Sequence, residues 1–451
     1  MITRRAFSAG TVAAPAVLGL NGRAEAQSSI DIAIIGAGAA GLMAGHRARE
    51  KGFKARIFEA RSRVGGRIFT DDSLGAGYEA GAFYIHFAER NPWREVAEAQ
   101  KVPLVDDNTL WGGFNVFREG KPIPPEERSR RRGAFGQLSA AVEQQGGGGD
   151  FSFEEAARRL APDLVEAAQS LTLLSLGEDP DKVSIRDYQQ LDSGDDLVVP
   201  SGYGHLAERY AQGLDIRLNT PVTAIDARAD ALRITTAAGD VLARAVIVTV
   251  PVGVLQREAI RFAPALPPAT LGAINGLGMG ALTKVALKFD GNRFGQSPWT
   301  QFFDQGGAAD KGRPDDLVNF EFWPFDRNIV VAMFGGNYAR ALAAKGERAA
   351  VETILARLAA IIGPDVRKAF GGGRLAGWSA DPFAAGSYSI ARPGEAAARA
   401  ALEAPVHGRI YFAGEANAGS ASMTAGGASL AGRRAVDEII RGFAAGGRKG
   451  I

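Results

Sequence analysis

The 451-residue sequence has no cysteine and only four histidines. Without cysteine the protein has no disulfides, thiolate metal sites, iron–sulfur clusters or cysteine nucleophile, and no cofactor can be bonded to a cysteine sulfur. The histidines stand far apart in the chain, at His46, His86, His205 and His407. Because no local spacing brings them together, we expect no metal site.

The sequence also lacks an excess of charge of either sign. Lysine plus arginine number 52 and aspartate plus glutamate 50, which gives a formal net charge of +2. Nucleic acid is therefore not an expected partner, because binding to a polyanion needs a concentrated basic face. A length of 451 residues, with 58 glycines, 21 prolines and 46% hydrophobic residues, is typical of a loop-rich soluble enzyme with more than one domain.

The apolar stretch near the start of the sequence is short. Residues 12–20 make up about half of the ~20 residues that a membrane span needs. They follow Arg4 and Arg5 and precede a small-x-small motif at residues 24–26. This order predicts a twin-arginine export signal over residues 1–26, and hence a periplasmic or secreted protein that is exported folded. A membrane anchor is the alternative, and we expect no transmembrane segment.

A strand, turn and helix pattern follows this segment. Residues 30–35 are mostly apolar, and Gly36, Gly38 and Gly41 form a G-x-G-x-x-G turn before an alanine-rich stretch. In such a turn the glycines allow a tight bend, the approach of a pyrophosphate and close packing of the helix, whose N-terminus binds the phosphate. A second strand ends at Glu59, where a carboxylate accepts hydrogen bonds from ribose hydroxyls. Together these features predict a dinucleotide site.

Residues 59–67 place three arginines around a Gly-Gly turn, where guanidinium groups can pair with phosphates or a flavin edge. At this distance from Gly36 the segment resembles the second FAD motif of the flavin amine oxidase superfamily. That superfamily includes monoamine oxidases, polyamine oxidases, histone lysine demethylases and L-amino-acid oxidases. Similar motifs follow in the family's order at residues 198–204, 220–225, 245–251, 378–383, 386–388, 411–415 and 425–432.

The resemblance implies that the protein binds FAD. Ser387 stands where monoamine oxidases carry the cysteine that is bonded to the flavin, so the FAD is expected to be non-covalent. The residues implied to hold it are Gly36, Gly38, Ala40, Gly41, Glu59, Ala60, Arg61, Gly65, Gly66, Arg67, Val222, Gly414, Glu415 and Thr424.

The resemblance also implies an α/β amine oxidase fold, in which a Rossmann-type FAD-binding domain carries an inserted α+β substrate domain. The FAD-binding domain is expected at 28–85, 198–262 and 375–442, and the substrate domain at 86–197 and 263–374. Periodicity predicts helices within 153–176 and 183–191, strands at 282–289, 318–323 and 329–334, and an amphipathic helix at 347–362.

Lys284 is one of five candidate catalytic residues. Alternation along its strand places it on one face with Ala286 and Lys288, which on its own indicates a solvated face. The resemblance instead implies the family lysine that holds a water at flavin N5. Trp378 and Tyr388 match the flavin-facing aromatic residues of the family, and both would otherwise be ordinary core residues.

The remaining candidates, Thr424 and His86, concern the amine. Thr424 stands where monoamine oxidases carry a second tyrosine. It also begins a helix whose N-terminus is implied to face the N1 and C2 carbonyl edge of the flavin, where the helix dipole would stabilise the reduced flavin. The position of the arginine that clamps the substrate carboxylate in L-amino-acid oxidases falls on Tyr84. His86 matches a histidine of several polyamine oxidases, and a buried structural histidine is its alternative.

These features imply oxidative deamination of an amine, with a polyamine or another secondary amine expected, to an imine and aldehyde while O₂ becomes H₂O₂. The expected partners are the small-molecule amine and O₂. Two alternative substrate classes remain: arylalkyl monoamines, and L-amino acids held by Arg90 or by an arginine of the helical region. A dehydrogenase that uses another electron acceptor is an alternative to the oxidase. A non-catalytic flavoprotein is a further one.

Overall fold

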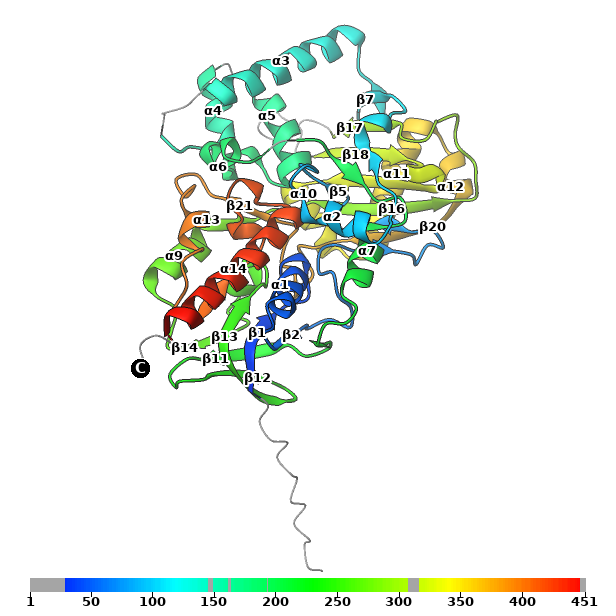
Figure 1. Ribbon diagram of the computed structural model, residues 1–451. Helices are drawn as coiled ribbons and strands as arrows, with labels where there is room; N and C mark the ends of the chain where they lie inside the picture. The colour runs from blue at the N-terminus through cyan, green and yellow to red at the C-terminus, as the bar shows by residue number, and fades with distance from the viewer. Residues whose placement is uncertain (1–28, 145–148, 161–163, 193, 307–315, 447–451) are drawn as a thin grey trace, which may run out of the picture.

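The computed structural model of the chain describes residues 29–144, 149–160, 164–192, 194–306 and 316–446 (Figure 1). The expected export signal at residues 1–26 lies outside the described residues, so export remains a prediction. Among the described helices, none combines the length and the apolar character that crossing a membrane requires.

The first sheet carries the predicted dinucleotide motif. Its order is β10-β2-β1-β13-β12-β11-β14, and β22 also pairs with β13. The strand β1 is parallel to both β2 and β13, while β12 runs antiparallel to its two neighbours. The strands are β10 (Ile216–Arg217), β2 (Ala55–Phe58), β1 (Ser29–Ile35), β13 (Gly239–Val248), β12 (Leu232–Thr236), β11 (Val222–Asp226), β14 (Arg261–Ala263) and β22 (Ile410–Phe412).

Two long helices pack against this sheet, α1 (Ala39–Glu50) and α14 (Ala425–Gly446), and they lie side by side in Figure 1. They approach each other so closely that a Cβ atom on Gly432 would overlap the carbonyl oxygen of Ala40. The start of the chain is therefore packed against its last long helix. The other helical segments around this sheet are α7 (Tyr203–Tyr210), α8 (Val252–Gln256), α9 (Pro268–Gly276), α13 (Ala398–Ala401), η6 (Glu415–Asn417) and η7 (Gly419–Ala421).

A second sheet has the order β20-β16-β19-β18-β17-β7-β8, and its central strands are antiparallel. The strands are β20 (Phe370–Ala376), β16 (Thr283–Phe289), β19 (Ile329–Phe334), β18 (Leu317–Phe322), β17 (Gln301–Gln305), β7 (Phe114–Arg118) and β8 (Lys121–Pro122). The accompanying helices are α10 (Gly336–Ala344), α11 (Glu347–Ile362) and α12 (Asp365–Ala369). The prediction of a strand at 329–334 and a helix at 347–362 is confirmed, and the other two strands differ by one residue.

A helical insertion stands above both sheets in Figure 1. Helices are found within 153–176 as expected: an α-helix ends at Leu160, another ends at Leu171, and a π-helix follows the second. The segments are α3 (Pro125–Gln144), α4 (Phe153–Leu160), α5 (Val165–Leu171), η3 (Thr172–Leu176), η4 (Pro180–Lys182) and α6 (Ile185–Gln189).

Short elements connect these parts. There are three small sheets: β3 pairs with β4 nearby in the sequence, whereas β15 pairs with β21, and β9 with both β5 and β6, over long distances in the sequence. Their strands and the remaining helices are β3 (Thr70–Asp71), β4 (Tyr78–Glu79), β5 (Tyr84–Ile85), α2 (Pro92–Ala99), β6 (Val105–Asp106), η1 (Asp107–Thr109), β9 (Leu197–Val198), β15 (Leu277–Met279), η5 (Pro324–Asp326) and β21 (Ser389–Ala391).

Candidate active site

A cavity of about 850 Å³ is lined by residues of both sheets and of the helical insertion. This volume lies near the upper end of the ~300–1,000 Å³ found for small-molecule and cofactor sites. One part of the cavity follows the glycine turn between β1 and α1, and the other lies against the second sheet. The two parts match the needs of a dinucleotide and of a second, smaller molecule.

The carboxylate of Glu59 organises the dinucleotide part. Its Oε2 accepts a hydrogen bond from Ala37 N at 2.7 Å, and its Oε1 accepts one from Arg61 N at 2.8 Å. The side chain is 6% exposed and lines the cavity. Glu59 therefore joins the glycine turn to the second predicted motif, and each carboxylate oxygen keeps a further lone pair for a ligand hydroxyl.

The space around Gly38 fits a pyrophosphate. A Cβ atom there would come no closer than 3.9 Å to the rest of the protein, so the fold itself would accept a side chain at this position. By contrast, a Cβ atom on Gly41 would overlap the carbonyl oxygen of Gly36. Gly41 thus serves the packing of helix on strand, whereas Gly38 leaves an open approach to the N-terminus of α1.

The arginines of the second motif bind protein groups. Arg61 forms a two-pronged ion pair with Asp381, at 2.7 and 2.8 Å, and does not depend on a phosphate for its partner. Arg67 donates hydrogen bonds to Ser387 O at 2.8 Å and to Glu415 Oε1 at 3.0 Å. Both arginines still line the cavity, so they hold its wall and add positive charge to it.

Lys284 lines the second part of the cavity. Its Nζ donates hydrogen bonds to the backbone oxygens of Glu79 and Gly81, both at 2.8 Å, which leaves one ammonium proton unassigned. The residue is 7% exposed, so the solvated-face interpretation of its strand is wrong. Burial lowers the pKa of Lys284 to about 8, although the charges of Glu79 and Glu321 act in the opposite direction.

Glu321 is a cavity residue that sequence reasoning missed. It lies on β18 opposite Val331 of β19, two strands from Lys284 on the same face of the sheet. Its buried side chain makes no hydrogen bond or ion pair with another described residue. Burial raises the pKa of Glu321 to about 7, opposed by the charge of Lys284. A carboxyl group without a partner thus faces the cavity at neutral pH.

His86 and Asp196 form a second polar pair in the wall. The Nδ1 atom of His86 lies 3.0 Å from both carboxylate oxygens of Asp196. This hydrogen bond fixes the ring and leaves Nε2 as a proton acceptor. The Tyr84 ring lies tilted against the His86 ring, with 5.3 Å between the ring centroids, and burial raises the pKa of its hydroxyl well above the usual value. Tyr84 is therefore a neutral wall residue.

The predicted aromatic residues also reach the cavity. Trp378 donates from Nε1 to Ala80 O at 2.9 Å, and the Tyr388 hydroxyl donates at 3.1 Å to the backbone oxygen of Ser175, a residue of the π-helix η3. Burial raises the pKa of Tyr388, so its hydroxyl stays protonated. Thr424 caps α14, because its Oγ1 accepts a hydrogen bond from Gly427 N at 2.9 Å. The N-terminus of α14 therefore opens at the cavity, where Thr424 and Ala425 are lining residues.

No cavity-lining arginine of the described residues is free to clamp a carboxylate. Arg327 reaches the second part of the cavity, but it donates to Gly77 O and Pro200 O, both at 2.6 Å. Arg90 pairs with Asp192 at 3.0 Å and does not line the cavity. The lining residues contributed by the described part of the helical insertion include no arginine.

Comparison with known proteins gives the family. The family described as flavin containing amine oxidoreductase matches residues 137–440, which is more than half of the chain, and a NAD(P)-binding Rossmann-like domain matches residues 34–99. The chain belongs to the flavin amine oxidoreductase family. FAD is the cofactor of this family, and the glycine-lined part of the cavity fits it.

Individual relatives agree with this membership. The human lysine-specific histone demethylase 2 is 27% identical over 453 residues, with 90% of this chain and 53% of that protein covered. Probable polyamine oxidase 4 of Arabidopsis thaliana is 28% identical over 435 residues, with coverage of 89% and 85%. The chain spans about half the length of the human demethylase and 30% of lysine-specific histone demethylase 1 homolog 3 of Arabidopsis thaliana.

Among solved structures, a putrescine oxidase bound to putrescine superimposes with a TM-score of 0.75 over 92% of this chain and 99% of that one. The identity is 20%, so this likeness concerns the amine oxidase fold. The expected fold, an α/β architecture with a Rossmann-type domain, is confirmed.

The cavity brings the predicted site residues of this family member together. Every predicted cofactor and catalytic residue lines it except Gly41, which packs beneath the turn. Their individual roles remain predictions. Sequence reasoning missed Glu321 and Asp196, and each left a signal: Glu321 is a charged residue inside the apolar run 318–323, and Asp196 belongs to an acidic segment just before β9.

Proposed function

We propose that the protein oxidises a diamine or polyamine at a carbon next to one nitrogen, while the cavity holds a second, protonated nitrogen of the same molecule. The observation that carries this proposal is Glu321, a buried carboxyl group that makes no hydrogen bond or ion pair with another described residue and shares a sheet face with Lys284. A buried carboxylate is costly unless it is paired, and an ammonium group of the substrate supplies the pair.

The strand register of the sheet indicates the distance between the two nitrogens of the substrate. Lys284 and Glu321 are separated by two strand spacings and by two residues along the strands. At ~4.8 Å between strands and ~3.4 Å per residue, their Cα atoms lie about 12 Å apart. Both residues line the cavity, and this separation matches the length of an extended aliphatic diamine.

The charges on the second part of the cavity also favour a cation. Three carboxylates line this part: Asp192 is paired with Arg90 and Asp196 is hydrogen-bonded to His86, whereas Glu321 makes no ion pair with another described residue. Its cationic residues, Lys284 and Arg327, direct N–H groups at backbone oxygens. The apolar side chains of Val331 and Met333 separate the charged groups. This arrangement suits an aliphatic chain with charged ends better than it suits a carboxylate.

The protein's own residues prepare the reacting nitrogen. That nitrogen must lose its ammonium proton before oxidation, and His86 Nε2, oriented by Asp196, is placed to accept it. When FAD is bound it accepts a hydride equivalent from the carbon, and O₂ is the expected final acceptor, giving H₂O₂. Water then converts the imine to an aldehyde and an amine.

The experiment is anaerobic mixing of the FAD-bound enzyme with matched compounds while the flavin absorbance is followed. The panel holds diamines of increasing length, polyamines, monoamines of equal chain length, arylalkyl amines and L-amino acids. We expect diamines or polyamines to reduce the flavin fastest. An L-amino acid that exceeds every amine at least tenfold in kcat/KM would contradict the substrate class. A flavin that no amine bleaches would instead indicate a non-catalytic flavoprotein.

The electron acceptor needs a separate measurement. Reduced enzyme is mixed with aerated buffer, and the return of the oxidised flavin spectrum and the formation of H₂O₂ are recorded. Rapid reoxidation with one H₂O₂ per flavin supports an oxidase. Slow reoxidation in air would identify a dehydrogenase that passes its electrons to another acceptor.

A further inference from the structure

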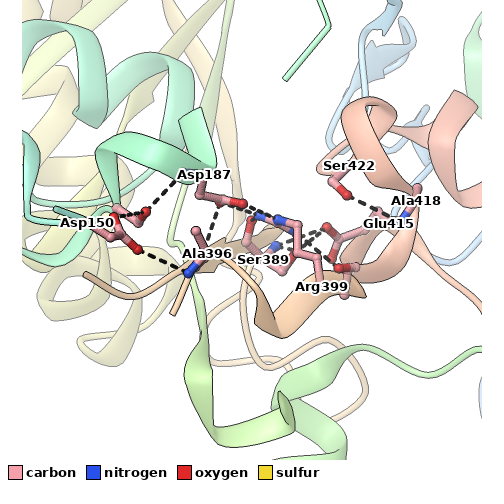
Figure 2. A network of polar contacts seen from close by, with 11 residues as sticks. Asp150, Asp187, Ser389, Ala396, Arg399, Glu415, Ala418 and Ser422 are labelled. Carbon is pink, nitrogen blue, oxygen red and sulfur yellow. Dashed lines mark hydrogen bonds and ion pairs between the residues drawn. The ribbon is translucent and has the colours of Figure 1, made fainter. Parts of the chain in front are cut away.

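A buried chain of polar contacts leads away from the cavity at Glu415, as Figure 2 shows. The Glu415 carboxylate accepts hydrogen bonds from Ser389 N, at 3.1 Å to each oxygen, and from Ser389 Oγ at 2.7 Å. It is also paired with Arg67 at 3.0 Å. Ser389 is fully buried and directly follows Tyr388, so its hydroxyl lies behind the cavity wall.

Arg399 continues this chain. Its Nη1 donates to Ser389 Oγ at 2.7 Å, while Nε and Nη2 form a two-pronged ion pair with Asp187 at 2.6 and 2.8 Å. The remaining two N–H groups donate to Ala416 O at 3.2 Å and Ser389 O at 3.1 Å. All five guanidinium donors are used, and the side chains of Arg399 and Asp187 are 6% and 3% exposed.

The chain ends in the helical insertion. Asp187 belongs to α6, where its Oδ2 also accepts Ala391 N at 2.9 Å and its own N–H donates to Ser184 Oγ at 2.9 Å. Ser184 Oγ in turn donates to Asp150 at 2.6 Å. The continuous contact path therefore joins the insertion to the carboxylate that lines the dinucleotide cavity.

The placement of these contacts is more specific than general packing. Arg399 binds the residue after Tyr388 and the residue after Glu415, and both Tyr388 and Glu415 line the cavity. Burying an arginine and an aspartate is costly, and replacing such a pair by apolar residues is often neutral or stabilising. Stability alone is therefore a weak reason for this ion pair.

We propose that Arg399 is a positioning residue for FAD binding: through Ser389 it fixes the Glu415 carboxylate, and through Asp187 it ties that carboxylate to the helical insertion. The proposal rests on the FAD site of the family and is independent of which amine is oxidised. The guanidinium fork is essential to it, because a lysine in its place has one ammonium group and cannot bind Asp187, Ser389 and Ala416 together.

The test uses the FAD-bound enzyme and the variants Arg399→Lys, Asp187→Asn and Ser389→Ala. The rate of FAD release on dilution is measured from the rise of free flavin fluorescence, and the flavin circular dichroism is recorded with it. Arg399→Lys is expected to release FAD at least tenfold faster than the wild type. Asp187→Asn and Ser389→Ala should act in the same direction, each to a smaller extent.

A matched control is available on α11, a helix that accompanies the second sheet. Arg357 binds Asp304 through Nε at 2.8 Å and Asp316 through Nη1 at 3.0 Å, its side chain is 15% exposed, and it does not line the cavity. Arg357→Lys is expected to lower Tm while FAD release stays within about twofold of the wild type. Equal acceleration of release in Arg399→Lys and Arg357→Lys at equal loss of Tm would overturn the proposal.

Ser389→Ala keeps the proposal testable if Arg399→Lys does not fold, because it leaves the Arg399–Asp187 pair in place. Unchanged FAD release in Ser389→Ala would overturn the proposed relay.

The double variant Ser389→Ala/Asp187→Asn tests the link to the insertion. Residues that act through one network are non-additive, so its release rate should be lower than the product of the two single effects predicts. Simple multiplication of the two effects would refute the link.

Discussion

Replacing Glu321 by glutamine is the sharpest test of the proposed substrate. The change keeps the size of the side chain and removes the charge that is proposed to bind the second nitrogen. A hydrogen bond to a charged group contributes ~1.5–3 kcal/mol. A loss of about 2 kcal/mol corresponds to a roughly 30-fold lower kcat/KM for a diamine, while a monoamine of the same length should change less than about threefold.

The pH dependence gives an independent check. Because burial raises the pKa of Glu321 to about 7, the carboxyl group is protonated and uncharged below that pH. The ratio of kcat/KM for the diamine to that for the monoamine should therefore rise as the pH increases through about 7. Both substrates must lose a proton from the reacting nitrogen, so the pH dependence of that step cancels in the ratio. In Glu321→Gln the ratio should be independent of pH.

Stability provides the control for this variant. The raised pKa of Glu321 means that folding disfavours its charged form, so the cost is present above pH 7 and is relieved as the pH falls through that value. Glu321→Gln should therefore be at least as stable as the wild type at pH 8, as measured by Tm. Glu352→Gln, an exposed change on α11, serves as the matched variant and should leave both substrates unaffected. Equal losses for the diamine and the monoamine in Glu321→Gln would refute the reasoning.

Three further predictions concern the cofactor and its surroundings. Acid precipitation should release all FAD into the supernatant, because the chain has no cysteine and Ser387 occupies the expected attachment position; flavin that stays with the pellet would contradict this. Lys284→Met should retain FAD but slow flavin reduction or reoxidation at least tenfold, as expected for losing a positioned group worth ~1.4 kcal/mol. The rate is followed by stopped-flow absorbance, and an unchanged rate would reject that role. Gly38→Val should fold, as judged by circular dichroism, but bind no FAD, since its side chain would occupy the pyrophosphate's approach; stoichiometric flavin in the purified variant would refute the site.

Local patterns predicted the elements that are regular. The strand β19 and the helix α11 have the predicted bounds because their apolar periodicity is uninterrupted. Helices are also present within 153–176 as predicted, but the last of them, with a buried Thr172, is a π-helix. A short pattern of hydrophobic residues does not distinguish a single π-helical turn from an α-helical one, because their hydrogen-bond spacings differ by only one residue.

Contacts in the site were predictable where both contacting residues belong to one sequence motif, and less predictable where they lie far apart in the sequence. The glycine turn follows β1 and Glu59 follows β2, the parallel strand next to it, so their meeting at one edge of the sheet follows from the strand–helix–strand pattern. The face of Lys284 could not be read from its own strand, because what covers that face comes from residues 79–81. The partner of Arg61 is likewise 320 positions away, at Asp381. Such pairings are set by the topology of the chain rather than by local spacing.

The order of the first sheet has a consequence for how the protein is made. The strand β1 cannot complete its pairing until β13 exists, and β13 in turn pairs with β22 near residue 410. The helix α1 packs on α14, which begins at Ala425. During synthesis the nucleotide-binding half therefore stays unfinished until nearly the whole chain has left the ribosome, and contacts of such long range slow folding. A nascent chain stalled before residue 400 should consequently depend on chaperones and bind no flavin.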